Sequence, residues 1–251
     1  MPVRAIVFDL FDTLVDLRAE DLSMEEYKGQ RIPASVRLTH ALVAERHGVD
    51  FDAFQQAMLE GMRALQESHL AHDREVTTFE RFRDALARLG IEDVALAREL
   101  STTHMGVLKS VVTAPAHHAQ VLDALRETLR VGLCSNFSHS ETAHQVLDEA
   151  GFRERLDAVV VSDAFGLRKP RREIFLETTR RLQVAPEETL HVGDSLRADV
   201  AGAAAAGLRT AWITRRVRDV AKALDAHDGP APDHQVADLG DLPPLLAELS
   251  G

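Results

Sequence analysis

The sequence predicts an α/β protein in which a Rossmann-like parallel sheet carries helices on both faces, with an inserted helical cap domain after the first strand. Two observations favour this fold class. Apolar runs of strand length alternate with segments of helix length over most of the chain, which is typical of a parallel sheet covered on both sides. One long segment near the N-terminus lacks such runs and has apolar residues at helical spacing instead.

Five apolar runs are expected to form the strands of the sheet. They lie at residues 3–8, 129–134, 156–161, 190–192 and 210–213. The segments after the later strands are long enough for helices. We expect these helices at residues 138–150, 172–182 and 197–206, a Pro/Gly-rich loop at 229–232, and a last helix over about 242–249.

The segment without strand runs is expected to be a domain of its own. Residues 17–112 would form the helical insert, and residues 1–16 together with 113–251 would form the α/β core. Within the insert, Gly48 and Gly90 are typical of helix ends, because glycine readily takes the left-handed conformation that terminates a helix.

The composition limits the possible partners. The chain has 29 Lys+Arg against 40 Asp+Glu, a net charge of −11, so its surface repels nucleic acid and anionic lipid. It lacks a long apolar segment typical of a signal peptide or a membrane span, and we expect a soluble, cytoplasmic protein. The single cysteine, Cys134, excludes a disulfide within the chain and is expected to be a buried, unreactive thiol.

Polar residues follow four of the predicted strands. In chain order these residues are Asp9 and Thr13, Ser135 and Asn136, Lys169, and Asp194 and Asp199. Because open parallel sheets bind ligands beyond the carboxyl ends of their strands, we expect these groups to converge at one edge of the sheet.

The chemistry of this set indicates a hydrolase with a covalent intermediate. Asp9 can attack phosphorus or an activated carbon and form an ester. The carboxylates of Asp9, Asp194 and Asp199 are suited to a hard cation such as Mg²⁺. Lys169 would neutralise developing negative charge and Ser135 would hydrogen-bond the transferred group, so a small anionic substrate is expected.

The order of these pieces resembles the four motifs of the haloacid dehalogenase (HAD) superfamily. The matching segments are Asp9-Leu-Phe-Asp-Thr13, Ser135-Asn136, Lys169-Pro170 and Gly193-Asp194-Ser195-Leu-Arg-Ala-Asp199. The match spans nearly the whole chain, and the insert resembles the helical (C1) cap of one subfamily. The resemblance implies a HAD-like core and hydrolase activity.

By this resemblance Asp9 would be the nucleophile, and Lys169 would hold the anionic intermediate. Thr13 and Ser135 would orient the substrate and the nucleophile loop. The substrate-binding residues that it implies are Ser135, Asn136, Lys169 and Phe11.

The resemblance also implies a magnesium site. Asp194 and Asp199 would bind Mg²⁺ directly or through water, together with the carboxylate of Asp9. The main-chain carbonyl of Phe11 would supply a further ligand.

Phe11 departs from the pattern of the family's phosphatases, which usually have at this position an aspartate that protonates the leaving alcohol. Such general acid–base help is worth about 10²–10⁴ in rate. Three alternatives follow: a phosphatase that is slow or takes its proton from Asp12 or His139, a metal-free 2-haloacid dehalogenase, or a ligand-binding protein with a degenerate site. Dehalogenases of the family have an aromatic residue here, but they lack the pair Asp194 and Asp199, so the magnesium-dependent phosphatase is favoured.

The cap is expected to close over the sheet edge and to set specificity. Its polar candidates for contacts with the substrate are Tyr27, Lys28, Arg31, Arg37 and His40. A solvated helix face is the more common role for any single one of them. The 12 histidines include no His-x-x-x-His pair, and most are expected to be surface or packing residues.

Overall fold

The computed structural model describes residues 2–250 and divides into two compact units. The first, here called the sheet unit, comprises Met1–Leu17 and Thr113–Gly251, and the second, the helical unit, comprises Arg18–Val112. Each unit has a hydrophobic core of its own. That the helical unit acts as a cap stays a prediction.

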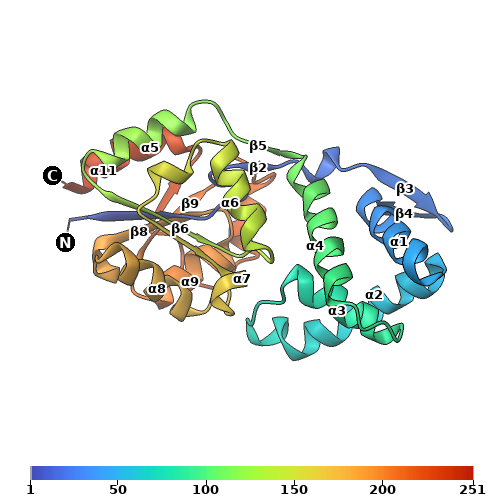
Figure 1. Ribbon diagram of the computed structural model, residues 1–251. Helices are drawn as coiled ribbons and strands as arrows, with labels where there is room; N and C mark the ends of the chain where they lie inside the picture. Colours follow the sequence, from blue (N-terminus) through green and yellow to red (C-terminus); the bar gives the residue numbers. More distant parts are fainter. Residues whose placement is uncertain (1, 251) are drawn as a thin grey trace. The chain divides into compact units, whose positions relative to one another are not determined.

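The sheet unit is built on a six-stranded parallel sheet in the order β10-β9-β8-β1-β6-β7 (Figure 1). Its strands are β1 (Ala5–Phe8), β6 (Arg130–Ser135), β7 (Ala158–Val161), β8 (Thr189–Gly193), β9 (Arg209–Ile213) and β10 (His234–Val236). From the central β1 the chain first adds β6 and β7 on one side and then β8, β9 and β10 on the other. The direction of winding therefore changes at β1, where sheets of this kind leave a crevice for ligands.

Helices cover both faces of this sheet. They are α5 (His118–Arg126), α6 (Ser140–Glu149), α7 (Ser162–Phe165), α8 (Arg172–Leu182), α9 (Gly202–Ala205), α10 (Val220–Asp225) and α11 (Leu242–Ser250). Helices α8 and α9 lie together on one face, and α5 and α11 lie together on the other (Figure 1). Ala5 and Val7 of β1 pack with Ile174 and Phe175 of α8, because alternate strand residues point to the same face.

The helical unit contains four main helices. They are α1 (Ala34–His47), α2 (Phe51–Ser68), α3 (Thr78–Arg88) and α4 (Val94–Lys109). Their apolar faces enclose a core made of Val43, Phe54, Phe82, Leu86, Leu96, Ala97 and Leu100. Thr77 and Glu80 form a capping box at the start of α3, and Gly48, with φ 67°, ends α1 as expected.

The predicted fold class is confirmed, and the mostly helical insert also contains two strands that the sequence did not predict. A β-hairpin, formed by β3 (Met24–Tyr27) and β4 (Gln30–Pro33), precedes α1. Its strands are largely exposed and polar, so they give no apolar run. Lys28 and Gly29 at its turn both have positive φ, 48° and 76°, as a two-residue hairpin turn requires.

Short elements of the sheet unit also differ from expectation. Strand β10 was not predicted because only Val236 of its three residues is buried. The single helix expected at 197–206 is instead a π-helical turn at Leu196–Ala201 followed by α9. Two-residue strands, β2 (Asp16–Leu17) and β5 (Val112–Thr113), stand at the points where the chain changes units.

Within residues 2–250, none of the helices combines the length and the apolar character that a bilayer span requires.

Candidate active site

The loop of residues 9–15, here called the β1 loop, fixes Asp9 at the carboxyl edge of the sheet. The backbone N–H of Asp9 donates to the carbonyl of Val192 on β8 at 2.9 Å, which continues the pairing of β1 with β8. The chain then turns back, since the N–H of Leu14 donates to the carbonyl of Leu10 at 2.9 Å. The Asp9 side chain is therefore held, nearly buried, at the middle of the sheet edge.

Lys169 joins three strand ends through its ammonium group. Its Nζ donates to Asp9 Oδ1 at 2.5 Å, to Asp199 Oδ1 at 2.6 Å and to the carbonyl of Cys134 at 2.8 Å. An ammonium has three N–H groups, so all of them are in use. The side chain of Lys169 is only 2% exposed, which makes these bonds the core of a buried charge network.

The backbone of Lys169 is held by Asn136. The N–H of Lys169 donates to Asn136 Oδ1 at 2.7 Å, and Asn136 Nδ2 donates to the carbonyl of Lys169 at 2.9 Å. Both ends of the Asn136 amide are thus used to position the lysine, a role that the sequence did not predict. Contact of Asn136 with substrate stays a prediction.

The turn after β8 places Asp194 and Asp199. Asp199 lies in the π-helical turn, where its Oδ2 accepts from the N–H of Ser195 at 3.0 Å. A Cβ built on Gly193 would overlap Asp199, so this position needs glycine. The carbonyl of Asp194 accepts from Trp212 Nε1 at 2.7 Å, which ties the turn to β9.

The carboxylates of Asp9, Asp194 and Asp199 form a cluster that suits a divalent cation. One oxygen from each lies within 4.8 Å of the others. Oxygen donors with this much negative charge are the ligands that Mg²⁺ prefers in proteins. The structure therefore brings together the three carboxylates that were predicted to bind Mg²⁺, whereas metal binding by them and by the Phe11 carbonyl stays a prediction.

The electrostatics of the cluster show that its negative charge is incompletely neutralised. Burial, with repulsion from Asp9 and Asp199, raises the pKa of Asp194 to about 7. Burial and repulsion from Asp199 outweigh the attraction of Lys169 and raise the pKa of Asp9 to about 6. Burial would also raise the pKa of Asp199, but Lys169 and His191 outweigh it and hold that pKa below its usual range.

Lys169 itself stays charged. Burial alone would lower the pKa of Lys169, yet the carboxylates of Asp199 and Asp9 raise it above its ordinary value. The lysine neutralises only part of the charge of three carboxylates, and the chemistry of the donors fits a divalent cation as the remaining partner.

His191 is a residue of this site that the sequence analysis did not identify. It lies on β8, is fully buried, and its Nε2 is 2.9 Å from Asp199 Oδ1. Its position on the strand that leads to Gly193 and Asp194 is the sequence feature that could have identified it as a site residue. Burial lowers the pKa of His191 despite the nearby Asp199, so the neutral ring donates its Nε2–H to the carboxylate.

Two hydroxyl groups of the motif residues are buried without a partner. Within residues 2–250, Thr13 Oγ1 and Ser135 Oγ are both shielded from solvent and make no hydrogen bond. Buried hydroxyls normally find a partner. The two groups are therefore consistent with a ligand that completes their hydrogen bonding.

Phe11 stands at the position where the sequence pattern of phosphatases has an aspartate, and its side chain makes an apolar contact. Its ring centroid lies 4.7 Å from that of Phe137, which follows the Ser135-Asn136 motif. The alternative acids are engaged in other contacts. Asp12 Oδ1 accepts from the N–H of Leu17 at 3.3 Å and lies 3.4 Å from Arg216 Nε, while His139 Nδ1 caps α6.

Some of the polar residues of the helical unit that were predicted to contact the substrate lie close together. Tyr27 and Lys28 both bond the carboxylate of Asp52, and the Arg37 guanidinium lies 3.7 Å from the centroid of the Phe51 ring. His40 Nε2 instead contacts the carbonyl of Val49 at 3.0 Å, and Arg31 is exposed. Their contact with a substrate stays a prediction.

Cys134 is buried, as expected for an inert thiol. Burial raises the pKa of Cys134 to about 12. Its carbonyl, not its sulfur, takes part in the site by accepting from Lys169.

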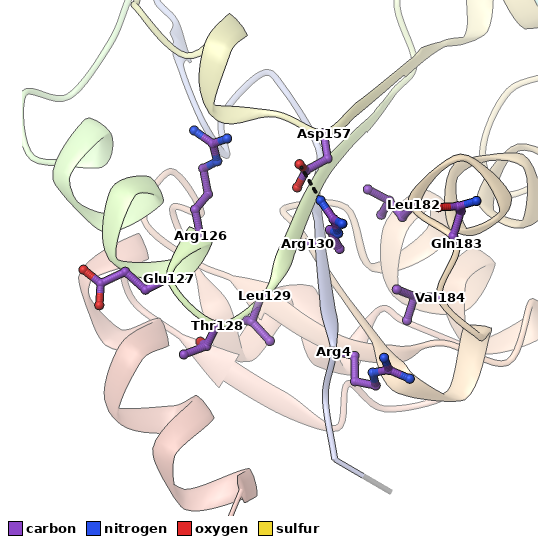
Figure 2. Close-up of a pocket in the computed structure, with 10 residues that line it drawn as sticks. All are labelled: Arg4, Arg126, Glu127, Thr128, Leu129, Arg130, Asp157, Leu182, Gln183 and Val184. Carbon is purple, nitrogen blue, oxygen red and sulfur yellow. Dashed lines mark hydrogen bonds and ion pairs between the residues drawn. The ribbon is translucent and has the colours of Figure 1, made fainter.

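A cavity of about 470 Å³ lies at the amino ends of the strands. Figure 2 shows the residues that line it. Its lining includes Arg4, which precedes β1, Arg130 at the start of β6, and Asp157, which precedes β7. None of the motif residues lines it. This cavity is therefore distinct from the carboxylate cluster at the strand ends.

The chain is similar in sequence to known hydrolases. The family model of haloacid dehalogenase-like hydrolases matches residues 3–207. The chain is 28% identical over 214 residues to the HAD-hydrolase YfnB of Bacillus subtilis, covering 84% of this chain and 83% of YfnB. It is 29% identical over 171 residues to phosphoserine phosphatase of Thermus thermophilus, covering 66% of this chain and 65% of that protein.

Solved structures share the fold. The 2-haloacid dehalogenase of Pseudomonas syringae aligns with a TM-score of 0.66 at 21% identity, covering 98% of this chain and 99% of that one. A magnesium-bound structure of YfnB aligns with a TM-score of 0.60 at 22% identity, covering 98% and 100%. At these identities the likeness concerns the fold alone.

Proposed function

Because this chain belongs to the haloacid dehalogenase-like hydrolases, we propose that it is a magnesium-dependent hydrolase of small phosphorylated metabolites that acts through an aspartyl-phosphate on Asp9. The observation that carries the proposal is the cluster of Asp9, Asp194 and Asp199, whose carboxylate oxygens lie within 4.8 Å of one another. A bound Mg²⁺ would supply the positive charge that lets an anionic phosphate approach these carboxylates.

In the first step, an oxygen of Asp9 forms a bond to phosphorus while the bond from phosphorus to the leaving oxygen breaks. Lys169, already 2.5 Å from Asp9, stays charged and stabilises the negative charge on the transferred group. The unpartnered hydroxyls of Thr13 and Ser135 would hydrogen-bond that group and orient it.

In the second step, water attacks the phosphorus of the aspartyl-phosphate, and the bond between phosphorus and the Asp9 oxygen breaks. The products are inorganic phosphate and the original carboxylate. His191 and Lys169 keep Asp199 in place through both steps, because each bonds its Oδ1.

Phe11 restricts the substrate class. Since its side chain cannot protonate a leaving oxygen, esters of weakly basic leaving groups, such as aryl phosphates, should be cleaved faster than alkyl phosphates. The relatives by sequence include a phosphatase, phosphoserine phosphatase of T. thermophilus, which supports phosphate chemistry.

We also propose that the helical unit, Arg18–Val112, acts as the cap and sets the choice of substrate. Tyr27, Lys28 and Arg37 are its first candidates for that role, because they gather beside Asp52 and Phe51.

One observation favours a second candidate, a 2-haloacid dehalogenase in which Asp9 attacks carbon and halide leaves. Phe11 and Phe137 form an apolar pair 4.7 Å apart where a phosphatase would need an acid, and halide needs no proton. Asp194 weighs against it, because a metal-free reaction gives this carboxylate no role.

A direct assay separates the two. The purified protein is expected to hydrolyse para-nitrophenyl phosphate with Mg²⁺, to stop with EDTA, and to lose activity in Asp9→Asn. Halide release from 2-chloropropionate that continues in EDTA would establish the dehalogenase instead. If neither substrate turns over while phosphate still binds, the chain is a ligand-binding member of the family.

A further inference from the structure

A second group of metal-ligand side chains lies in the sheet unit and shares no residue with the Asp9 site. His117 and His118 stand at the start of α5, and Asp238 follows β10. One ligand atom from each lies within 4.8 Å of the others, although 120 positions of sequence separate His118 from Asp238. We call these three residues the His–Asp cluster.

The proton on His118 can be assigned from its partner. Its Nδ1 lies 2.8 Å from the carbonyl of Leu14, and a carbonyl only accepts, so Nδ1 carries the hydrogen. The Nε2 atom of the neutral ring then presents a lone pair. This arrangement, with one ring nitrogen donating to a carbonyl and the other free to coordinate, is the usual one for a histidine that binds a metal.

The Nε2 of His118 is an unpartnered atom pointed into the cluster. Its side chain is 0% exposed, its Nε2 makes no hydrogen bond within residues 2–250, and it lies 3.7 Å from Asp238 Oδ2. Burial lowers the pKa of His118. A lone pair facing a carboxylate is unfavourable unless a cation lies between them.

The other two residues of the His–Asp cluster, His117 and Asp238, are partly exposed to solvent. His117 Nε2 lies 2.5 Å from Asp238 Oδ1, and the side chains of His117 and Asp238 are 50% and 28% exposed. Asp238 Oδ1 also accepts from the N–H of Gly240 at 2.9 Å, which fixes the orientation of the carboxylate. Solvent can therefore reach the cluster from the side of His117.

The neighbouring charges permit a cation. Arg215 Nε lies 3.4 Å from Asp238 Oδ2, but the two terminal nitrogens of this guanidinium pair with both oxygens of Asp16. Asp238 thus has only part of the charge of Arg215, because Asp16 shares that guanidinium.

We propose that His117, His118 and Asp238 bind one divalent transition-metal ion of the Zn²⁺ type. Two imidazole nitrogens and one carboxylate oxygen are a donor set typical of Zn²⁺ and poorly suited to Mg²⁺. Donors on a tetrahedral Zn²⁺ lie roughly 3.4 Å apart, since the bonds are about 2.0–2.1 Å long. The 3.7 Å between His118 and Asp238 is already close to this spacing, and the half-exposed His117 has room to move outward.

The ion would connect three separate parts of the sheet unit. His117 and His118 begin α5, Asp238 begins the turn after β10, and His118 holds the carbonyl of Leu14 in the β1 loop. Metal binding would therefore stabilise the loop that carries Asp9 without taking part in its chemistry.

The test is a titration of the full-length, EDTA-treated protein with Co²⁺ in excess Mg²⁺, so that Mg²⁺ competes for the Asp9 cluster. We expect one Co²⁺ per chain with the strong visible absorption of a four-coordinate ion bound by imidazole, and displacement by Zn²⁺. His117→Gln should weaken this binding at least tenfold, whereas His144→Gln, a half-buried histidine of α6, should not. Asp194→Asn should leave the absorption unchanged, which separates this site from the proposed magnesium site.

Thermal unfolding supplies a second measurement. Zn²⁺ should raise the melting temperature of the unsubstituted protein and of His144→Gln but not of His117→Gln. Because His117 is half-exposed, its replacement leaves the fold intact. Absence of the strong absorption in the unsubstituted protein, or equal affinity in His117→Gln, would overturn the proposal.

Discussion

Phe11 is the residue that most restricts which leaving groups the proposed reaction can accept. It lies in the β1 loop two positions after Asp9, and its ring contacts Phe137. Asp12 and His139 are the other candidates for a proton donor. Asp12 contacts Leu17 and Arg216, and His139 caps the start of α6. In the proposed reaction, the leaving group would therefore depart without a proton from these side chains.

Phe11→Asp is expected to raise the hydrolysis of alkyl phosphates by at least about tenfold, because it supplies the missing acid. The hydrolysis of aryl phosphates should change much less. Initial rates on para-nitrophenyl phosphate and on an alkyl phosphate measure the two effects. Phe11→Asn is the matched control, since it has the same shape without an acidic proton, and an equal gain in both variants would contradict the explanation.

The carboxylates of Asp9 and Asp194 give the metal-free protein a distinctive dependence on pH. Their pKa values of about 6 and about 7 lie above the ordinary 3.8. Between the ordinary value and these raised values of pH, the folded state therefore binds more protons than the unfolded chain. Stability contributed by these groups must then fall as pH rises through this window.

In EDTA, we expect the free energy of unfolding to be lower at about pH 7.5 than at about pH 5.5, by on the order of 1–3 kcal/mol from these groups. Urea denaturation at the two pH values measures it. Asp194→Asn should reduce the difference, and Mg²⁺ should stabilise the protein more at the higher pH. A difference that is the same in Asp194→Asn would show that Asp194 does not carry the effect.

Among single residues, those in the segments that follow apolar strands could be predicted from the sequence. The structure brings Asp9, Lys169 and Asp199 into direct contact because parallel strands end at one edge of the sheet. His191 and the His–Asp cluster were not predicted. Their contacts depend on side-chain direction and on packing between elements distant in sequence, which periodicity does not report.

At the scale of elements, the turn after β8 is the most constrained. The π-helical turn brings Asp199 back over Gly193, and the N–H of Val200 donates to the carbonyl of Ser195, five residues earlier, at 3.2 Å. Such π turns are common at functional sites. The sequence predicted a continuous helix here because the apolar spacing of Leu196–Ala201 does not distinguish the two forms.

Gly193→Ala is expected to abolish most activity while the protein stays folded, because the new methyl group displaces Asp199 from Lys169. Activity and circular dichroism together measure this outcome. Gly106→Ala in α4 is the control: no atom lies near its Cβ position, and alanine should stabilise that helix by roughly 0.5–1 kcal/mol. Full activity in Gly193→Ala would contradict the placement of Asp199.

The hairpin of the helical unit could not be predicted from the sequence for a different reason. Its residues, Met24–Tyr27 and Gln30–Pro33, are mostly exposed on both faces, so neither alternation nor an apolar run marks them. By contrast, α8 was predicted at its observed bounds, Arg172–Leu182, since its buried residues repeat at the helical period.

At the scale of the whole molecule, the two units have separate cores. The ends of the helical unit are joined by a hydrogen bond from the N–H of Arg18 to the carbonyl of Val111 at 3.0 Å. The core of the helical unit is built only from its own helices. The unit therefore has the properties of a segment that folds by itself.

We expect the isolated fragment of residues 18–112 to fold and to unfold cooperatively on heating, as monitored by circular dichroism. Phe54→Ala should destabilise it by about 3–5 kcal/mol, because Phe54 is fully buried in its core. Leu59→Ala, at an exposed position of α2, is the control. A fragment without a cooperative transition would mean that this unit depends on the rest of the chain.

The saturated ammonium of Lys169 has a consequence for the order of events in the proposed reaction. Its three protons already have acceptors, so an arriving anion gains one only when an existing acceptor releases it. In the proposed reaction Asp9 would lose its charge on becoming an acyl phosphate, whereas Asp199 and the Cys134 carbonyl would not change. The hydrogen bond to Asp9 is thus the one that would weaken, and its N–H would become free for the phosphoryl oxygens as negative charge accumulates on them.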